Sequence, residues 1–284
     1  MHTRTGSRSW LFAIALISFG GHAPYAWADN TADTSQPATL DTVPAHLLAR
    51  RWGVPQATIF PVLASSLDAV HELGTAGAPH GSTVIVEEQT AGRGRDGRTW
   101  RSPYGGVWLG VLLRPARADV GALSIRAGLV VADAVDELLG APRARVKWPN
   151  DVLVDDRKVA GVLCEGRWQG EALQWLALGV GVNVCNAIPA ELATAAAALY
   201  ELLPGVRRVD LLDRLVPGLA AVTAGGLTLT EAECAAFAER DWLRGRVLRA
   251  PTAGRAVGIR PDGALLVDGG AGPVAVLEGH VELV

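Results

Sequence analysis

The chain has 284 residues, 49% of them hydrophobic, which is enough for one large domain or two smaller ones with a full core. The formal net charge of −3 argues against a general nucleic-acid binder, because any positive charge must be local. The three cysteines (Cys164, Cys185 and Cys234) have neither metal-ligand spacing nor the pattern of a disulfide framework, so we expect them to be reduced, as in a cytosolic protein.

The first residues have the pattern of a secretory signal. Arg4 and Arg8 precede an apolar run over 10–19, and the Ala-Trp-Ala sequence at 26–28 resembles a signal-peptidase site. The alternative is that the true start codon lies downstream of the first methionine. The run is too short for an ordinary membrane span, so no membrane association is expected. Under both alternatives residues 1–38 are excluded from the predicted fold.

Short apolar runs and amphipathic segments then predict an α+β domain. Strands are expected over 59–63, 83–86, 106–113, 145–148, 152–154, 159–165 and 175–184. Helices are expected over 42–52, 65–74, 119–139, 190–203, 209–223 and 230–240. Ser65 is a good N-cap, and Asp68 stands three residues later in a capping-box position.

From about residue 243 the pattern changes to short β runs separated by turns. These runs lie at 246–248, 256–259, 264–267, 274–277 and 281–284. Their spacing predicts a small β-barrel appended to the α+β domain.

The stretch from Glu88 to Trp100 carries the strongest chemical signal. It reads Glu-Gln-Thr-Ala-Gly-Arg-Gly-Arg-Asp-Gly-Arg-Thr-Trp, with three glycines between three arginines. The glycines let the backbone come close to a ligand, and the arginines offer planar charged groups suited to phosphate or carboxylate. With only Asp96 among them, the arginines are expected to repel one another until an anion binds. We therefore predict a loop that is mobile when empty and ordered by an anionic ligand.

Other interpretations of this loop are weaker. Gly92, Gly94 and Gly97 formally match the dinucleotide fingerprint, but that fold needs a helix directly after the loop. Residues 99–106 include Pro103 and two glycines and cannot form one. A solvated basic loop remains the alternative if the loop is considered alone.

Three further segments bear on this choice. Residues 145–151 combine a strand, a lysine and a Pro-Asn-Asp turn, and Lys158 stands at the mouth of an apolar strand. Gly179 and Gly181 interrupt another buried strand. Each has an ordinary alternative: Lys158 as an exposed turn lysine, the turn residues as a turn alone, and the glycines as sites of close packing.

Together these segments resemble the biotin protein ligases. The resemblance rests on Gly-Arg-Gly-Arg-x-Gly-Arg-x-Trp at 92–100, Lys-Trp-Pro-Asn-Asp at 147–151, Asp-Arg-Lys-Val-Ala-Gly at 156–161, Gly-Val-Gly-Val-Asn at 179–183 and the closing segment 258–267. It spans roughly residues 60–284. It implies a class II synthetase-like catalytic domain over 39–241, with a mixed β-sheet and flanking helices, and a C-terminal SH3-like barrel over 242–284.

The resemblance also implies a two-step reaction. The carboxylate of biotin attacks the α-phosphorus of MgATP to give biotinyl-5′-AMP, and a lysine of a biotin carboxyl carrier protein then attacks that anhydride. Lys158 is expected to bridge the two reacting anions, and Arg93 and Arg95 to close over the intermediate.

The family positions for biotin map onto Ser65, Ser66, Leu67, Gln89, Gly92, Arg93, Gly94, Arg95, Lys158, Gly161 and Gly179. Those for the nucleotide map onto Arg93, Arg95, Arg98, Trp100, Lys147, Asn150, Asp151, Lys158 and Asn183. Asn150 or Asp151 is also a candidate for the magnesium shell, with no metal ligand firmly assigned. Two positions depart from the family pattern: Leu67 replaces an asparagine, and Asp96 stands where arginine is frequent.

The sequence therefore predicts a monofunctional, cytoplasmic ligase without a DNA-binding domain, with the mis-assigned start favoured over export. A homodimer is an open possibility of the family. The alternatives are a lipoate or octanoate transferase of the same fold and a non-catalytic protein that binds biotin or a nucleotide.

Overall fold

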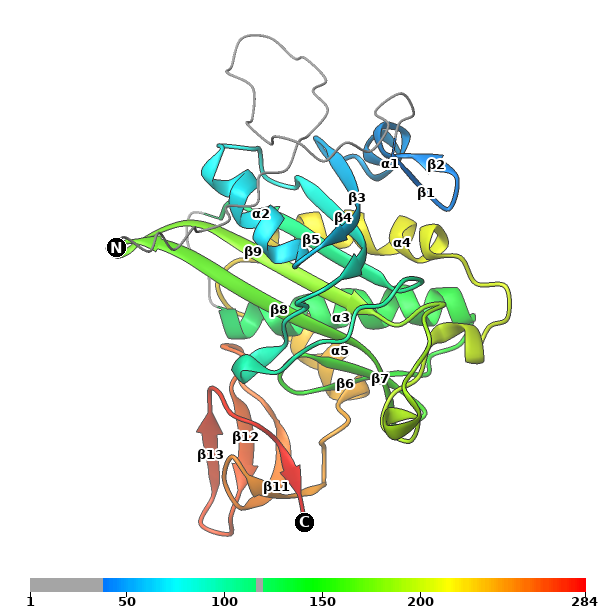
Figure 1. The fold of residues 1–284 in the computed structure, drawn as a ribbon. Helices are drawn as coiled ribbons and strands as arrows, with labels where there is room; N and C mark the ends of the chain where they lie inside the picture. Colours follow the sequence, from blue (N-terminus) through cyan, green and yellow to red (C-terminus); the bar gives the residue numbers. More distant parts are fainter. Residues whose placement is uncertain (1–37, 116–119) are drawn as a thin grey trace, which may run out of the picture. The chain divides into compact units, whose positions relative to one another are not determined.

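A computed structural model describes residues 38–115 and 120–284, and Thr39–Val284 form one compact unit (Figure 1). The signal-like segment over 10–28 falls outside the described residues. Within the described ranges, no helix is long and apolar enough to span a membrane.

The centre of the unit is a seven-stranded mixed sheet in the order β3-β4-β5-β9-β8-β7-β6. The strands are β3 (Ala57–Leu63), β4 (Thr83–Gln89), β5 (Val107–Leu113), β6 (Ala144–Lys147), β7 (Asp151–Val154), β8 (Arg157–Gln169) and β9 (Ala172–Val182). Only β3 and β4 run parallel; every other neighbouring pair in this sheet is antiparallel. β5 is buried along its whole length, as its apolar residues on both faces predict.

Helices cover both faces of this sheet. They are α1 (Ala45–Trp52), α2 (Ser66–Thr75), α3 (Val120–Leu139), α4 (Arg208–Ala221) and α5 (Glu231–Arg240). Figure 1 shows α2 in front of the sheet and α3 and α4 behind it. α2 lies very close to β5, because a Cβ added at Gly110 would stand 2.6 Å from Val70 Cγ2 and 3.1 Å from the Ser66 carbonyl oxygen. The expected mixed sheet with flanking helices is confirmed.

Ser65 is the N-cap of α2, as predicted, and its hydroxyl accepts a hydrogen bond from the Leu67 amide at 3.3 Å. Asp68 does not complete a capping box. Its carboxylate instead accepts from Arg93 at 2.8 Å, in the loop that follows β4. The helix also continues past Gly74 to Thr75. A small hairpin of β1 (Thr39–Leu40) and β2 (Val43–Pro44) precedes α1 and was not predicted.

The helix expected over 190–203 is absent, so that prediction is wrong. Two short 3-10 turns stand there, η2 (Ala190–Leu192) and η3 (Leu199–Glu201). The segment between them is used for strand-like pairing. The Lys158 amide donates to the Ala195 carbonyl at 2.8 Å, and the Ala197 amide donates to the Lys158 carbonyl at 3.0 Å. This pairing overrides the helix propensity of the alanines. It also holds the backbone of Lys158, whose N–H and C=O both bond to this segment.

The C-terminal strands form a separate five-stranded antiparallel sheet in the order β13-β12-β11-β10-β14. They are β10 (Val247–Ala250), β11 (Gly254–Ile259), β12 (Leu265–Asp268), β13 (Pro273–Val276) and β14 (Glu282–Leu283). All five predicted strands are confirmed within one or two residues. No pairing between β13 and β14 closes the sheet in the described residues, so the expected barrel is not confirmed.

Two hydrogen bonds, the first of them buried, join the turn at 261–263 of the C-terminal sheet to the rest of the unit. The indole nitrogen of Trp148, directly after β6, donates to the Gly263 carbonyl at 2.8 Å, and the Leu229 amide donates to the Pro261 carbonyl at 2.7 Å. Trp148 is 1% exposed, so its indole N–H has little access to water. These bonds fix the turn at 261–263 beside the segment that follows β6.

Candidate active site

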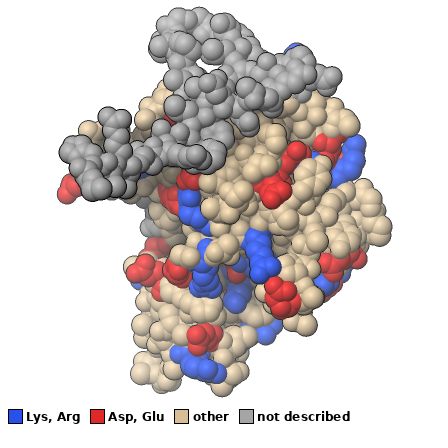
Figure 2. Space-filling view, viewed as in Figure 1, with Lys and Arg blue, Asp and Glu red and all other residues tan. Residues whose placement is uncertain are grey.

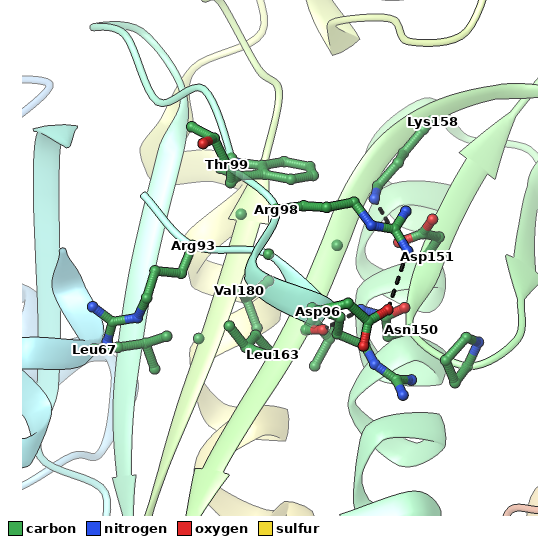
Figure 3. A pocket seen from close by; sticks show the side chains of 18 of the residues that line it. Leu67, Arg93, Asp96, Arg98, Thr99, Asn150, Asp151, Lys158, Leu163 and Val180 are labelled. Carbon is green, nitrogen blue, oxygen red and sulfur yellow. Dashed lines mark hydrogen bonds and ion pairs between the residues drawn. The ribbon is translucent and has the colours of Figure 1, made fainter. Parts of the chain in front are cut away.

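A cavity on the α2 side of the sheet collects side chains from distant parts of the sequence (Figure 3). It is lined by the start of α2, the loop over residues 89–100 (the glycine-arginine loop), the β6–β7 turn, strands β8 and β9, and the C-terminal segment 279–281. The predicted site residues that line it are Ser65, Ser66, Leu67, Gln89, Arg93, Gly94, Arg95, Arg98, Trp100, Lys147, Asn150, Asp151, Lys158, Gly161 and Gly179.

Two predicted residues do not line the cavity. Gly92 supports the loop from within, because an added Cβ would stand 2.4 Å from the Trp100 carbonyl oxygen and 2.6 Å from Ser102 Oγ. Asn183 is 6% exposed, and its side-chain oxygen accepts a hydrogen bond from Asn186 at 3.1 Å. Both residues therefore shape the neighbourhood of the cavity rather than its wall.

Several lining residues were not predicted. They are Asp96, Thr99, Trp108, Leu109, Trp148, Pro149, Val162, Leu163, Val180, Gly181, Gly279, His280 and Val281. The apolar members belong to buried strands, and a continuous apolar run does not show which residues face a ligand. The alternation with Gly161 and Gly179 was a usable signal for Leu163 and Gly181. No local pattern indicated that 279–281 would reach the cavity.

Lys158 is not an exposed turn lysine. Its ammonium lies 2.6 Å from Asp151 Oδ1 and 4.8 Å from the centre of the Trp100 ring, within cation–π distance. Gly161 makes room for this arrangement, since an added Cβ there would stand 3.2 Å from the Trp100 ring and 3.4 Å from Lys158 Nζ. The ammonium is thus held inside the cavity by a carboxylate and an aromatic face.

Trp100 lies against β9 on its other side. A Cβ added at Gly181 would stand 2.6 Å from the indole nitrogen, so only glycine leaves space for the ring. This indole N–H is buried and has no hydrogen-bond partner among the described residues. An unpaired buried donor on the wall of a cavity is a natural contact for a polar ligand atom.

The expectation that the loop arginines are opposed by Asp96 alone is wrong. Arg93 pairs with Glu165 of β8 at 3.1 Å and with Asp68 of α2 at 2.8 Å. These acids lie 72 and 25 residues away in the sequence, so no local charge count could show them.

The other arginines of this region differ in their ion-pair partners. Arg98 pairs with Asp96 at 3.2 Å and also lies 3.0 Å from His280 Nδ1, and Arg101 pairs with Glu191 at 3.2 Å. Among the described residues, Arg95 has no ion-pair partner. Arg95 is therefore the loop arginine whose charge remains available to a ligand.

Gln89 links the loop to the start of α2. Its side-chain oxygen accepts from the Ser66 amide at 2.6 Å, and its side-chain nitrogen donates to Ser102 Oγ at 2.8 Å. Beside it, Leu67 occupies the space that Gly179 leaves, because an added Cβ would stand 3.0–3.2 Å from the Leu67 side chain. This inner end of the cavity is consequently apolar where the sequence departs from the family pattern.

The β6–β7 turn forms the other end. Burial lowers the pKa of Lys147, although Asp151 nearby acts in the opposite direction, and its ammonium lies 5.2 Å from the Trp242 ring. The Asn150 side-chain amide donates to the Val162 carbonyl at 2.7 Å. No group of three or more His, Cys, Asp or Glu residues suited to a metal ion occurs in residues 38–115 and 120–284.

Figure 2 shows lysine and arginine atoms gathered near the centre of the visible face, with acidic atoms beside them. Lys147, Lys158 and Arg95 all line the one cavity, which also has an apolar end at Leu67. Such a cavity suits a ligand with an apolar body and one or more anionic groups, whose repulsion the three cations offset.

Comparisons with known proteins agree with this description. The model of the biotin/lipoate A/B protein ligase family matches residues 60–183. The bifunctional ligase/repressor BirA of Bacillus subtilis is 30% identical over 235 residues, which cover 78% of this chain and 72% of the relative. The biotin--[acetyl-CoA-carboxylase] ligase of Mycobacterium tuberculosis is 42% identical over 128 residues, covering 43% of this chain and 46% of the relative.

A solved structure shows the same similarity in three dimensions. The biotin protein ligase of Aquifex aeolicus, in complex with biotin and ATP, matches with a TM-score of 0.67 and 26% identity. The match covers 81% of this chain and 98% of that one. The fold, the cavity and the extent of the similarity to the Bacillus relative together show that this chain belongs to the biotin protein ligase family.

Proposed function

We propose that the protein uses ATP to convert biotin to biotinyl-5′-AMP and then transfers the biotinyl group to a lysine of a biotin carboxyl carrier protein. The observation that carries the proposal is the placement of Lys158, Arg95 and Lys147 around one cavity that also has an apolar end. Relatives named as biotin--[acetyl-CoA-carboxylase] ligases support the acceptor, and a relative in complex with biotin and ATP supports both substrates.

In the first step a carboxylate oxygen of biotin forms a bond to the α-phosphorus of ATP, and the bond to the pyrophosphate oxygen breaks. Two anions must meet, so cations beside the reacting centre lower the barrier. Lys158 is assigned to this position, because its ammonium is held in the cavity at Asp151 and Trp100. Lys147 and the unpaired N–H of Trp100 are assigned to the nucleotide.

In the second step the neutral amine of the acceptor lysine attacks the carbonyl carbon of the mixed anhydride. The carbonyl–oxygen bond to AMP breaks, and the amine loses a proton as the amide forms. Water must be kept from the anhydride before the acceptor arrives. Arg95 is assigned to the retention of the adenylate, since its charge has no partner in the described part of the chain.

ATP is proposed to enter with Mg²⁺ as MgATP. Asp151, which pairs with Lys158, and the neighbouring Asn150 both line the cavity, and two such oxygen-bearing side chains suit a magnesium ion that keeps its phosphate and water ligands.

The remaining proposals concern organisation. Residues 39–241 are assigned to the catalytic domain and 242–284 to an SH3-like domain, and the protein is proposed to act in the cytoplasm because ATP and the carrier are found there. A dimeric state and the absence of DNA binding remain predictions.

The proposal is tested by incubating the full chain with biotin, MgATP and a purified carrier domain. We expect labelled carrier, with no labelling when ATP is omitted or when lipoate or octanoate replaces biotin. Labelling by lipoate in preference to biotin would favour the transferase alternative. Biotin binding without labelling would favour a non-catalytic binding protein.

A further inference from the structure

Arg93 is bound more completely than any other arginine of the loop. Its Nε and Nη2 donate to the two oxygens of Glu165 at 3.1 and 3.2 Å, and its Nη1 donates to Asp68 at 2.8 Å. This two-bond geometry with Glu165 fixes the orientation of the guanidinium as well as its position. The loop is thereby tied at one point to strand β8 and to helix α2.

Glu165 is itself held by further contacts. His71 Nε2 lies 3.0 Å from Glu165 Oε2, and Trp175 Nε1 donates to His71 Nδ1 at 3.1 Å. Because Nδ1 accepts from the indole, the proton of a neutral His71 lies on Nε2 and points at the carboxylate. Hydrogen bonds from His71, and then from Arg93, lower the pKa of Glu165 to about 2 despite its burial. Trp175, His71, Glu165 and Arg93 thus form one connected chain from β9 to the loop.

The Arg93 side chain points away from Lys158, the cation assigned to the reacting centre. In Figure 3 its guanidinium lies beside Leu67, on the opposite side of the cavity from Lys158 and Asp151. Two residues later, Arg95 has no ion-pair partner among the described residues. The first arginine is therefore fixed, and the second has its charge available.

We propose that Glu165 is a positioning residue, which holds Arg93 as the fixed anchor of the loop so that Arg95 can close over the adenylate. This inference rests on the proposed function and deepens it. It assigns the role of Arg93 to anchoring, whereas the sequence had placed Arg93 over the intermediate beside Arg95. A loop with one fixed end orders at a smaller entropic cost than a loop that is free along its length.

The test measures release of biotinyl-5′-AMP from the full chain, made with radiolabelled ATP and followed by rapid filtration. Glu165→Gln keeps the size of the side chain and removes its charge. We expect the variant to release the adenylate about tenfold faster than the unmodified protein, because a charge-assisted contact is lost, and to label added bystander protein. Glu165→Asp should retain part of the slow release.

Two further variants separate anchoring from general damage. Arg93→Ala should release the adenylate at least as fast as Glu165→Gln, because it also removes the ion pair with Asp68. The double variant should be no worse than Arg93→Ala, because the contact with Glu165 is already lost in that variant. The matched control is Asp133→Asn, which breaks the 2.7 Å ion pair between Asp133 of α3 and Arg240 of α5, away from the cavity lining, and should leave release unchanged.

Three outcomes would overturn the anchor. The first is that Glu165→Gln releases the adenylate at the same rate as the unmodified protein. The second is slower release by Glu165→Gln, as expected if Glu165 holds Arg93 away from its ligand. The third is that the effects of Glu165→Gln and Arg93→Ala add in the double variant. If the unmodified protein makes no adenylate at all, the proposed function fails instead. The two failures are therefore distinguishable.

Discussion

At the scale of single residues, the four arginines between Arg93 and Arg101 differ in their ion pairs. Arg93 pairs with Glu165, Arg98 and Arg101 form exposed pairs with Asp96 and Glu191, and Arg95 lacks an ion-pair partner among the described residues. Asp96 therefore offsets the charge of Arg98 in particular rather than that of all the loop arginines. It also adopts a positive φ of 56°, which aspartate tolerates better than most residues.

Arg95→Gly should still form the adenylate but lose it to solution. We expect labelling of bystander lysines to rise about tenfold over the unmodified protein, because the loop arginine that has no ion-pair partner among the described residues is removed. The measurement is biotin incorporation into added serum albumin in the absence of carrier. Arg101→Gly serves as the control, since its ion pair with Glu191 lies at exposed side chains. Labelling confined to the carrier in Arg95→Gly would refute the role of Arg95 as a lid.

Gly181→Ala should disturb the nucleotide end of the site. The added methyl group would stand 2.6 Å from the indole nitrogen of Trp100, and this ring also faces Lys158. We expect the KM for ATP to rise about tenfold, which corresponds to a loss of about 1.4 kcal/mol in binding free energy. The KM for biotin should change little. Gly269→Ala is the control, because its added methyl would have one neighbour at 3.4 Å. Equal changes in both KM values would argue against this placement of Trp100.

At the scale of elements, the contact between α2 and β8 includes the Glu165 carboxylate of β8, which lies 3.0 Å from His71 of α2. The pKa of Glu165 is lowered from 4.5 to about 2, with hydrogen bonding from His71 as the largest favourable cause. A carboxyl whose folded pKa is depressed stabilises the fold fully above its unfolded pKa and loses that contribution as pH falls through the folded value.

The pH prediction follows from this sign. Stability should fall between about pH 4.5 and about pH 2 in the unmodified protein, with part of the fall belonging to Glu165. Glu165→Gln should show a shallower acid limb and the same slope above pH 6. Urea unfolding at a series of pH values measures both. Parallel curves for the two proteins across the acid range would contradict the assignment.

The elements that sequence reasoning predicted well are those with a local cause. Ser65 caps α2, Thr230 caps α5, and the apolar run at 107–113 is a buried central strand. The segment 190–203 failed because its backbone pairs with Lys158, a contact between residues about 40 positions apart that helix propensity does not describe.

The site shows the same division. The motifs contained most of the residues that line the cavity, including Lys147, Asn150, Asp151 and Lys158. They did not contain the acids that bind the loop, or His280 from the chain end, since these come together through the sheet order. Gly179 lines the cavity as predicted, but the space beside it is filled by the Leu67 side chain.

At the scale of the whole described unit, the buried hydrogen bond from Trp148 to Gly263 links the seven-stranded sheet to the C-terminal sheet. Trp148→Phe removes the hydrogen bond to Gly263 and leaves a buried carbonyl without its donor. We expect a loss of about 1–3 kcal/mol in the free energy of unfolding, measured with urea. Trp168→Phe is the control, because Trp168 is 50% exposed at the end of the β8–β9 hairpin. Equal stability of Trp148→Phe and the unmodified protein would show that this bond contributes nothing.

The central claim is that Lys158 brings the biotin carboxylate and the α-phosphate together. Biotin-dependent exchange of labelled pyrophosphate into ATP measures the first step alone, without carrier. We predict exchange in the unmodified protein that requires biotin, and a loss of about 10²–10³-fold in Lys158→Ala, the range for removal of one transition-state contact. Exchange that does not require biotin, or that Lys158→Ala supports at the full rate, would contradict the account.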